Sequence, residues 1–204
     1  MRLGIAAVVC LVLAVPAPAR ADGLYFTESF GGAKTDNELA RFTDGGFRIK
    51  WALGYRAKRV ALEAWLGLDL PAEADVAAQD PELMTYGLDA KYAFRIAGRL
   101  EAYARGSMSR MEVDTGSLTG YGGRGLGVGT GLQIKGKAPW VLLIYPPAAL
   151  VCLIPDTCKK MGPKATVAVF VDQGYDFYRL HGPGPAIDAE VTRWTLGFAV
   201  GGDF

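Results

Sequence analysis

The sequence predicts an all-β fold, a transmembrane up-and-down antiparallel barrel of about eight strands. In segment after segment, apolar residues alternate with small or charged ones, which is the period of a strand whose two faces meet different surroundings. The alternation is clearest in residues 191–204 (VTRWTLGFAVGGDF), where one face is apolar with aromatic residues at both ends. About eleven residues of tilted strand are enough to cross a bilayer core. Beyond residue 21, no run of about 18 apolar residues is uninterrupted, so the sequence excludes spanning helices.

Residues 1–21 predict a cleaved signal peptide. Arg2 supplies the positive start, residues 3–15 form the apolar core, and Ala-Arg-Ala at 19–21 supplies the small residues of a cleavage site. A retained anchor helix is the alternative, but the apolar run is short and two prolines break it. Without Arg2 and Arg20 the chain has 20 basic and 21 acidic residues, a net charge of −1. We therefore expect no nucleic-acid partner.

Residues 22–204 are the length of one domain. The chain is rich in glycine (27) and aromatic residues (9 Tyr, 9 Phe and 4 Trp), which favours strands and tight turns over helices. The predicted strands, in order, are residues 23–31, 47–56, 59–69, 85–95, 99–108, 122–135, 165–178 and 191–204.

The first predicted strand, 23–31, has an ambiguous register because Glu28 lies among apolar residues. The loop that follows, 32–45, contains TDNELARF, which could form one or two helical turns. The second and third strands alternate cleanly, and the pair Ala57-Lys58 between them predicts a tight turn.

A longer connection, 70–84, leads to the fourth strand and is rich in Ala, Asp and Glu. Its carboxylates could attract calcium, although they lack any ordered ligand spacing. The pair Ala97-Gly98 predicts a tight turn between strands four and five, and a loop at 109–121 precedes the glycine-rich sixth strand. The last loop, 179–189, contains the only histidine, His181.

Tight turns therefore alternate with longer loops along the chain. Small bacterial barrels place their short turns in the periplasm and their long loops outside the cell. With that orientation, aromatic residues fall at both ends of the strands, as expected for two interfacial girdles. We expect Tyr55, Phe94 and Phe204 in the periplasmic girdle, and Phe47, Tyr86, Phe177 and Trp194 in the outer one.

This pattern resembles the small eight-stranded outer-membrane barrels of the OmpA/OmpX type, over residues 22–204 and as pattern rather than identity. The resemblance implies a monomer in the bacterial outer membrane, in contact with outer-membrane lipid and lipopolysaccharide. It also implies that the last strand is the signal read by the outer-membrane assembly machinery. The residues that fit this signal are Leu196, Phe198, Val200 and Phe204, whereas Gly202 stands where an aromatic residue is common.

An apolar insert at 136–163, between strands six and seven, departs from the pattern. Pro146-Pro147 in its middle excludes one spanning helix, so we expect a re-entrant or interfacial segment. In an oxidising compartment Cys152 and Cys158 would form a disulfide, with two free thiols as the alternative. Zinc is disfavoured because no His or further Cys stands nearby. A further hairpin within the insert would instead give ten strands.

The inward faces of the predicted strands carry charges of both signs, which must pair because an unpaired buried charge costs several kcal/mol. An eight-stranded barrel has room inside only for its own side chains, so we expect a plugged lumen and not an open pore. A low-conductance path for ions or protons is the alternative. The predicted interior charge network comprises Arg48, Lys50, Glu63, Asp89, Lys91, Glu101, Arg105, Asp172, Asp176 and Arg193.

The sequence predicts no catalytic residue, cofactor or metal site, and the expected role is structural or in surface interaction. Residues 120–131 contain a formal G-x-G-x-x-G, but a strand follows where a phosphate-binding loop needs a helix. The alternative is a small ligand-binding or lipid-modifying barrel that uses outer-loop residues near His181. For the lipid-modifying activity, His181 would act with a serine and an acid, and no spacing links it to them. The residues considered are Ser107, Ser109, Asp176 and Asp188.

Overall fold

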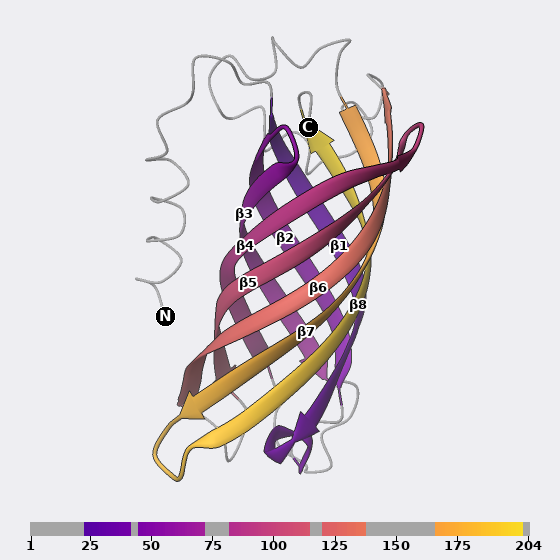
Figure 1. The fold of residues 1–204 in the computed structure, drawn as a ribbon. Helices are drawn as coiled ribbons and strands as arrows, with labels where there is room; N and C mark the ends of the chain where they lie inside the picture. The colour runs from indigo at the N-terminus through magenta and orange to yellow at the C-terminus, as the bar shows by residue number, and fades with distance from the viewer. Residues whose placement is uncertain (1–22, 42–44, 72–81, 115–119, 138–165, 202–204) are drawn as a thin grey trace.

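The described residues of the computed structural model, 23–41, 45–71, 82–114, 120–137 and 166–201, form a closed antiparallel barrel (Figure 1). Its strands are β1 (Leu24–Asn37), β2 (Gly46–Ala57), β3 (Val60–Pro71), β4 (Glu82–Ala97), β5 (Leu100–Asp114), β6 (Tyr121–Lys137), β7 (Thr166–His181) and β8 (Ile187–Gly201). Each strand pairs with its neighbours in sequence, and β1 closes against β8. Within these ranges, no helix has the length and apolar character needed to cross a membrane. The predicted up-and-down barrel is confirmed.

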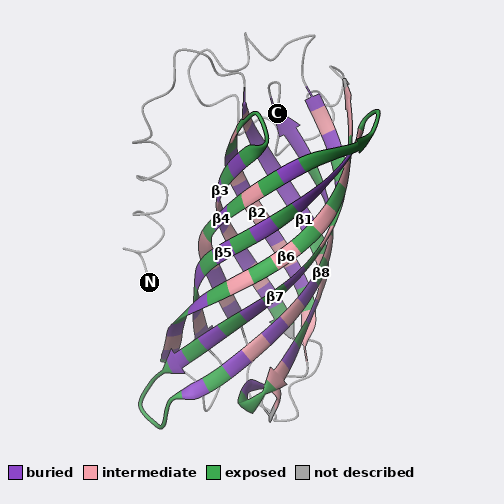
Figure 2. Ribbon diagram, viewed as in Figure 1, coloured by how far each residue is buried: buried purple, intermediate pink, exposed green. Residues whose placement is uncertain are grey.

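The strand faces are oriented as the alternation predicts. Leu62 and Val128 point outward and are 63% and 65% exposed, whereas Glu63 and Asp89 point inward and are buried. Exposed and buried residues alternate along the strands in Figure 2. Large apolar side chains therefore cover the outside of the barrel, and ionic side chains lie within it, as expected for a barrel in lipid.

Two tight turns lie at the same end of the barrel as the start of β1 and the end of β8. They fall at Lys58-Arg59 and Gly98-Arg99, one residue later than predicted in each case. Lys58 and Gly98 adopt left-handed backbone conformations, with φ of 55° and 50°, which lets two residues reverse the chain. Following the rule for outer-membrane barrels, we assign this end to the periplasm and the opposite end to the outside.

Most of the predicted aromatic girdle residues are confirmed as outward-facing. Phe47 and Trp194 both lie opposite Gly32 near the outer end, and Phe47 also stacks on Phe30 with ring centroids 6.4 Å apart. Tyr55 and Phe94 are exposed near the tight turns. Tyr86 is partly exposed, and Phe177 is exposed near the outer end.

Several strands are longer at the outer end than the sequence analysis predicted. The predicted loops 32–45, 109–121 and 179–189 began too early, because β1 runs to Asn37, β5 to Asp114 and β7 to His181. The reason is that the alternation of these strands continues with its polarity reversed.

The reversal is clear along β5. Its outward residues change from Met108 to Arg110 and Glu112, while its inward residues change from the hydroxyl of Ser109 to the buried side chains of Met111 and Val113. A strand that leaves the bilayer meets water on its outer face, so polar residues belong there and apolar residues inside. The outer end of the barrel thus has the polarity of a soluble protein.

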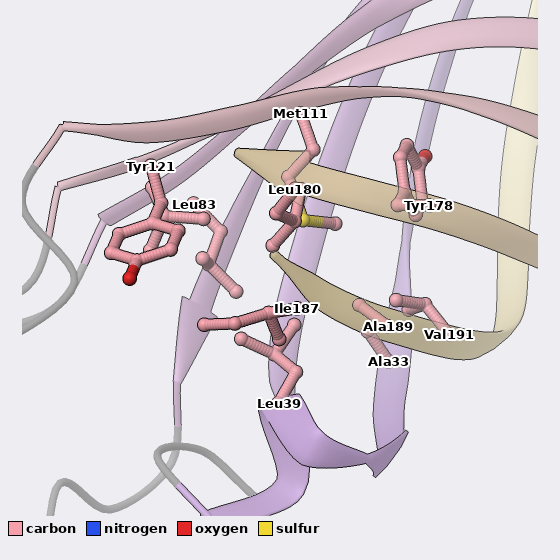
Figure 3. Close-up of a cluster of buried hydrophobic side chains, with 11 residues drawn as sticks. Ala33, Leu39, Leu83, Met111, Tyr121, Tyr178, Leu180, Ile187, Ala189 and Val191 are labelled. Atoms are coloured by element: carbon pink, nitrogen blue, oxygen red, sulfur yellow. The ribbon is translucent and has the colours of Figure 1, made fainter. Parts of the chain in front are cut away.

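An apolar cluster fills the inside of this outer end (Figure 3). The predicted helical turn is confirmed as a 3-10 turn, η1 (Glu38–Arg41), and it places Leu39 fully buried within the cluster. A Glu38 carboxylate oxygen accepts a hydrogen bond from the backbone N–H of Asp188 at 3.2 Å, which fixes η1 to β8. The cluster comprises Ala33, Leu39, Leu83, Met111, Val113, Tyr121, Tyr178, Leu180, Ile187, Ala189 and Val191.

The ambiguous register of β1 is resolved with Tyr25 inside and Glu28 outside. Glu28 lies opposite Trp51, whose indole N–H donates to a Glu28 carboxylate oxygen at 2.9 Å. On β2, Trp51 is midway between the outer aromatic residue Phe47 and the periplasmic one, Tyr55. The Glu28 carboxyl group therefore lies on the outer side of the barrel wall, near the middle of the apolar band, but the residue is buried, with 9% of it exposed.

The alternative of ten strands is wrong. β6 pairs directly with β7, from Gly122 opposite His181 to Lys137 opposite Thr166, so no further hairpin enters the barrel between them. Residues 136 and 137 belong to β6, and the rest of the predicted insert lies outside the described residues. The predicted signal peptide, the Cys152–Cys158 disulfide and Phe204 also lie outside them.

Candidate functional site

The inside of the barrel holds several groups of ion pairs, which we together call the lumen network. It consists of the ten predicted residues, all of which point inward, together with Arg56, Asp69 and Lys135. The structure therefore brings together every charged residue that the sequence analysis assigned to the interior. The network residues are Arg48, Lys50, Arg56, Glu63, Asp69, Asp89, Lys91, Glu101, Arg105, Lys135, Asp172, Asp176 and Arg193.

On the periplasmic side of the apolar cluster, two arginines share the carboxylate of Asp69. Arg48 Nη1 lies 2.7 Å from Asp69 Oδ2, and Arg193 Nη2 lies 3.7 Å from the same oxygen. Arg193 also pairs with Asp176, which accepts a hydrogen bond from Ser107 Oγ at 2.9 Å. These side chains are almost fully buried, so their charges interact with little screening by water.

The middle of the network is centred on Asp89. Its carboxylate lies 2.7 Å from Lys50 Nζ and 3.2 Å from Arg105 Nη1, and it accepts a hydrogen bond from the Trp65 indole at 2.7 Å. Arg105 extends to Asp172 at 3.1 Å. The Lys50 ammonium also lies 4.7 Å from the centre of the Trp65 ring, a cation–π contact.

Toward the periplasm, the network continues through two glutamates. Glu63 pairs with Lys91 Nζ at 2.7 Å and accepts a hydrogen bond from the Tyr25 hydroxyl at 2.8 Å. Glu101 lies 2.8 Å from Arg56 Nη1 and 2.9 Å from Lys135 Nζ. The ionic side chains thus extend from the apolar cluster to the level of the tight turns.

Sequence reasoning omitted Arg56, Asp69 and Lys135 from the network, although a signal for each was present. Asp69 and Arg56 occupy inward positions of their alternating strands, and Lys135 has the same parity as the inward glycines of β6. Each stands at the end of a predicted strand, where few neighbouring residues define the alternation. Their partners come from other strands, which the local pattern does not reveal.

Glycines on β6 and β7 provide the room that the network occupies. A Cβ at Gly127 would lie under 3.0 Å from both Asp176 and Ser107, and one at Gly174 would overlap the Arg105 guanidinium. In the formal G-x-G-x-x-G, Gly122 and Gly125 belong to β6, as predicted, and Gly120 lies in the turn just before it.

Two small cavities lie inside the described part of the barrel. One cavity of about 20 Å³ is lined by network residues including Glu63, Arg105 and Arg193, and one of about 10 Å³ lies beside Leu83 and Met111. A cavity of about 10–15 Å³ is the least that holds one water molecule. Over the described ranges, no group of three His, Cys, Asp or Glu side chains is arranged to hold a metal ion.

The structure does not bring the residues of the alternative lipid-modifying site together. His181 is exposed at the outer end of β7, opposite Gly122. Ser107 and Ser109 point into the barrel, where they bond to Asp176 and to the Tyr178 hydroxyl. The histidine and the two serines are thus on opposite sides of the barrel wall.

A closed eight-stranded cylinder with lipid-compatible side chains outside and paired charges inside defines a transmembrane β-barrel. Residues 5–140 match the family described as the outer membrane protein beta-barrel domain. Because this match covers more than half of the chain, the chain belongs to that family, and its location is the bacterial outer membrane. No curated protein matches the sequence.

Several solved structures are similar in fold. Neisserial surface protein A (NspA) is 19% identical, with a TM-score of 0.55, and the similarity covers 88% of this chain and 97% of that one. Ail of Yersinia pestis is 14% identical over 88% of this chain and 98% of its own, with a TM-score of 0.41. The N-terminal barrel domain of Pseudomonas aeruginosa OprF is 14% identical over 88% and 99%, with a TM-score of 0.42. The likeness to NspA is one of fold.

Proposed function

We propose that the protein is a closed-lumen outer-membrane barrel whose role is structural or lies in interactions of its outer surface. The observation that supports this is the packing of the interior in two layers. An apolar cluster occupies the outer end, and the lumen network occupies the rest, with a cavity of about 20 Å³ among its residues.

Opening a path through these layers would be costly. Removing one partner of a buried ion pair typically costs about 3–5 kcal/mol, because the other charge is left without compensation. A path would have to separate several such pairs and also displace Leu39 and its neighbours from the cluster. A barrel that conducts ions would need an interior that opens at a lower free-energy cost.

The network also supports a non-catalytic role. Apart from the group around Glu101, the network holds five positive and five negative side chains, so its charges balance. They are Arg48, Lys50, Lys91, Arg105 and Arg193, and Glu63, Asp69, Asp89, Asp172 and Asp176. These groups are engaged with one another in ion pairs. We infer that contacts with other molecules are made by the outer surface and outer loops, where recognition usually occurs on a rigid scaffold.

Assembly and oligomeric state complete the proposal. Leu196 and Phe198 are exposed on the lipid face of β8, which suits a strand that the outer-membrane assembly machinery reads from outside. Val200 belongs to the same face but is buried, opposite Phe26 of β1. A monomer is expected because the barrel is closed and leaves no unpaired strand edge.

Conductance measurements test the closed lumen. Purified protein is inserted into planar bilayers, with heat-modifiable gel mobility used to verify that the inserted sample is folded and a porin used as the positive control. The proposal predicts no current above the bare-bilayer background and no swelling of proteoliposomes in small sugars. Long-lived, uniform channel openings by folded protein would overturn it and favour the low-conductance channel.

A further inference from the structure

Three arginines lie side by side on the outer surface of the barrel. Arg110 of β5 is directly opposite Arg124 of β6, and Arg124 is directly opposite Arg179 of β7. All three side chains point outward and are exposed. Neighbouring strands are about 4.8 Å apart, so the three positions extend over roughly 10 Å.

The row of arginines marks the outer boundary of the apolar band. The preceding outward residues on the membrane side are Met108, Leu126 and Phe177, all exposed and apolar. On each of the three strands, the arginine is the first outward residue beyond that band, where the polarity reversal begins. This position corresponds to the level of the headgroups in the outer leaflet.

The charges of the row are incompletely balanced by the protein. Arg110 Nε lies 3.4 Å from Glu112 Oε1, an oxygen that also accepts a hydrogen bond from the Tyr86 hydroxyl. Arg179 Nε lies 4.0 Å from Asp188, and both of these pairs are exposed to solvent. Within the part of the chain that the structure describes, Arg124 has no carboxylate partner. Like charges directly across strands destabilise a sheet, so this arrangement favours an external anion.

We propose that Arg110, Arg124 and Arg179 bind the phosphate groups of a phosphorylated glycolipid in the outer leaflet. A guanidinium group binds phosphate through two parallel hydrogen bonds, and three adjacent groups can bind more than one phosphate of the same headgroup. The apolar side chains of Leu126 and Phe177 lie next to the row on the membrane side and face the acyl chains. The ligand is amphipathic because the surface on which it lies is cationic on one side and apolar on the other.

The matched control is Lys34 on β1. It is also an exposed cation beyond the apolar band at the outer end, but it lies three strands away from β6 and forms an ion pair with Asp36 at 3.2 Å. Lys34→Gln therefore removes one positive charge at the same end without altering the row. The row itself is altered by Arg124→Gln and by the triple variant with Gln at all three arginine positions.

Binding is measured with full-length protein refolded in zwitterionic detergent, using intrinsic tryptophan fluorescence and native mass spectrometry. The probes are bisphosphorylated lipid A, its dephosphorylated form, phosphatidylglycerol and inorganic phosphate. We expect lipid A affinity to fall about threefold in Arg124→Gln and at least about tenfold in the triple variant, while Lys34→Gln stays within about twofold of wild type. Heat-modifiable mobility checks that every variant is folded.

Equal lipid A affinity in the wild type and the folded triple variant would overturn the proposal. So would equal binding of the phosphorylated and dephosphorylated lipids, because the arginines would then not be reading phosphate. Inorganic phosphate that binds as tightly as lipid A would show a free-anion site instead, and phosphatidylglycerol that binds equally would show a general anionic-lipid surface. None of these results depends on whether the lumen conducts ions.

Discussion

Replacing one glycine on the inner face of β6 is expected to disrupt the lumen network. In Gly127→Ala, the new methyl group would lie under 3.0 Å from Asp176 Oδ1 and from Ser107 Oγ. Neither atom can move away freely, because they bond to each other at 2.9 Å and Asp176 also pairs with the buried Arg193. The substitution must therefore break or lengthen these contacts.

The magnitude combines two effects. Overpacking of a filled interior costs about 1–3 kcal/mol, and weakening a hydrogen bond to a buried charged group costs about 1.5–3 kcal/mol. We expect Gly127→Ala to lower the free energy of unfolding by about 3 kcal/mol, at the lower end of their combined range. This is large compared with the stability of a typical domain, about 5–15 kcal/mol.

Gly106→Ala is the matched control. Gly106 is on the outer face of β5 beside the same strand, opposite Val128, and a Cβ there would meet no heavy atom within 4 Å. Alanine at an open position stabilises a protein by about 0.4–1 kcal/mol, through the entropy of the unfolded chain. The two variants thus carry the same substitution on opposite sides of the wall and should shift stability in opposite directions.

The assay is reversible unfolding by guanidinium chloride in lipid vesicles, followed by tryptophan fluorescence and by heat-modifiable mobility. The expected result is a lower midpoint for Gly127→Ala and an unchanged or higher midpoint for Gly106→Ala. Failure of Gly127→Ala to refold where Gly106→Ala refolds counts as the same result. Coincident midpoints would refute the inference that the interior is filled against β6.

Three further predictions use the same unfolding assay. Leu39→Ala removes a fully buried side chain from the apolar cluster, and the unfolding free energy should fall by about 2–4 kcal/mol. An unchanged unfolding free energy would mean that η1 does not close the outer end of the barrel. Asp89→Asn should cost about 3–5 kcal/mol because it leaves buried cations without their counter-charge, and adding Lys50→Met should recover part of that loss. Glu28→Gln retains an acceptor for the Trp51 indole while removing a buried carboxyl group from the apolar band, so stability in vesicles should rise by up to about 1 kcal/mol. A loss of stability would show that the carboxylate itself is required.

The fold was predictable because the surroundings of the strands impose a simple period. Residues 47–56 and 60–69 have the faces that the alternation predicts, and the two strands pair through a turn one residue later than predicted. The outer strand ends were missed for a physical reason. A membrane strand is recognised by its apolar outward face. Beyond Met108 or Phe177 that face becomes charged although the strand continues.

Ten members of the lumen network were predicted from the sequence, whereas Arg56, Asp69, Lys135 and the pairings of the network were not. Alternation is enough to place Asp89 and Arg105 inside, since a residue of the wrong parity would face lipid. Which cation meets which carboxylate depends on strand register and on contacts across the lumen. The hydrogen bond between Tyr103 and Asp172 joins residues 69 positions apart, and no local pattern contains that information.

The reversed polarity at the outer end has a consequence for biogenesis. Side chains such as Arg124 and Arg179 must cross the hydrocarbon layer once, when the barrel enters the membrane. An arginine at the bilayer midplane costs about 2–4 kcal/mol, and several such charges travel together with the acidic residues beside them. The same free-energy cost opposes movement of these side chains back through the hydrocarbon layer. We therefore expect the inserted barrel to keep its orientation in the membrane.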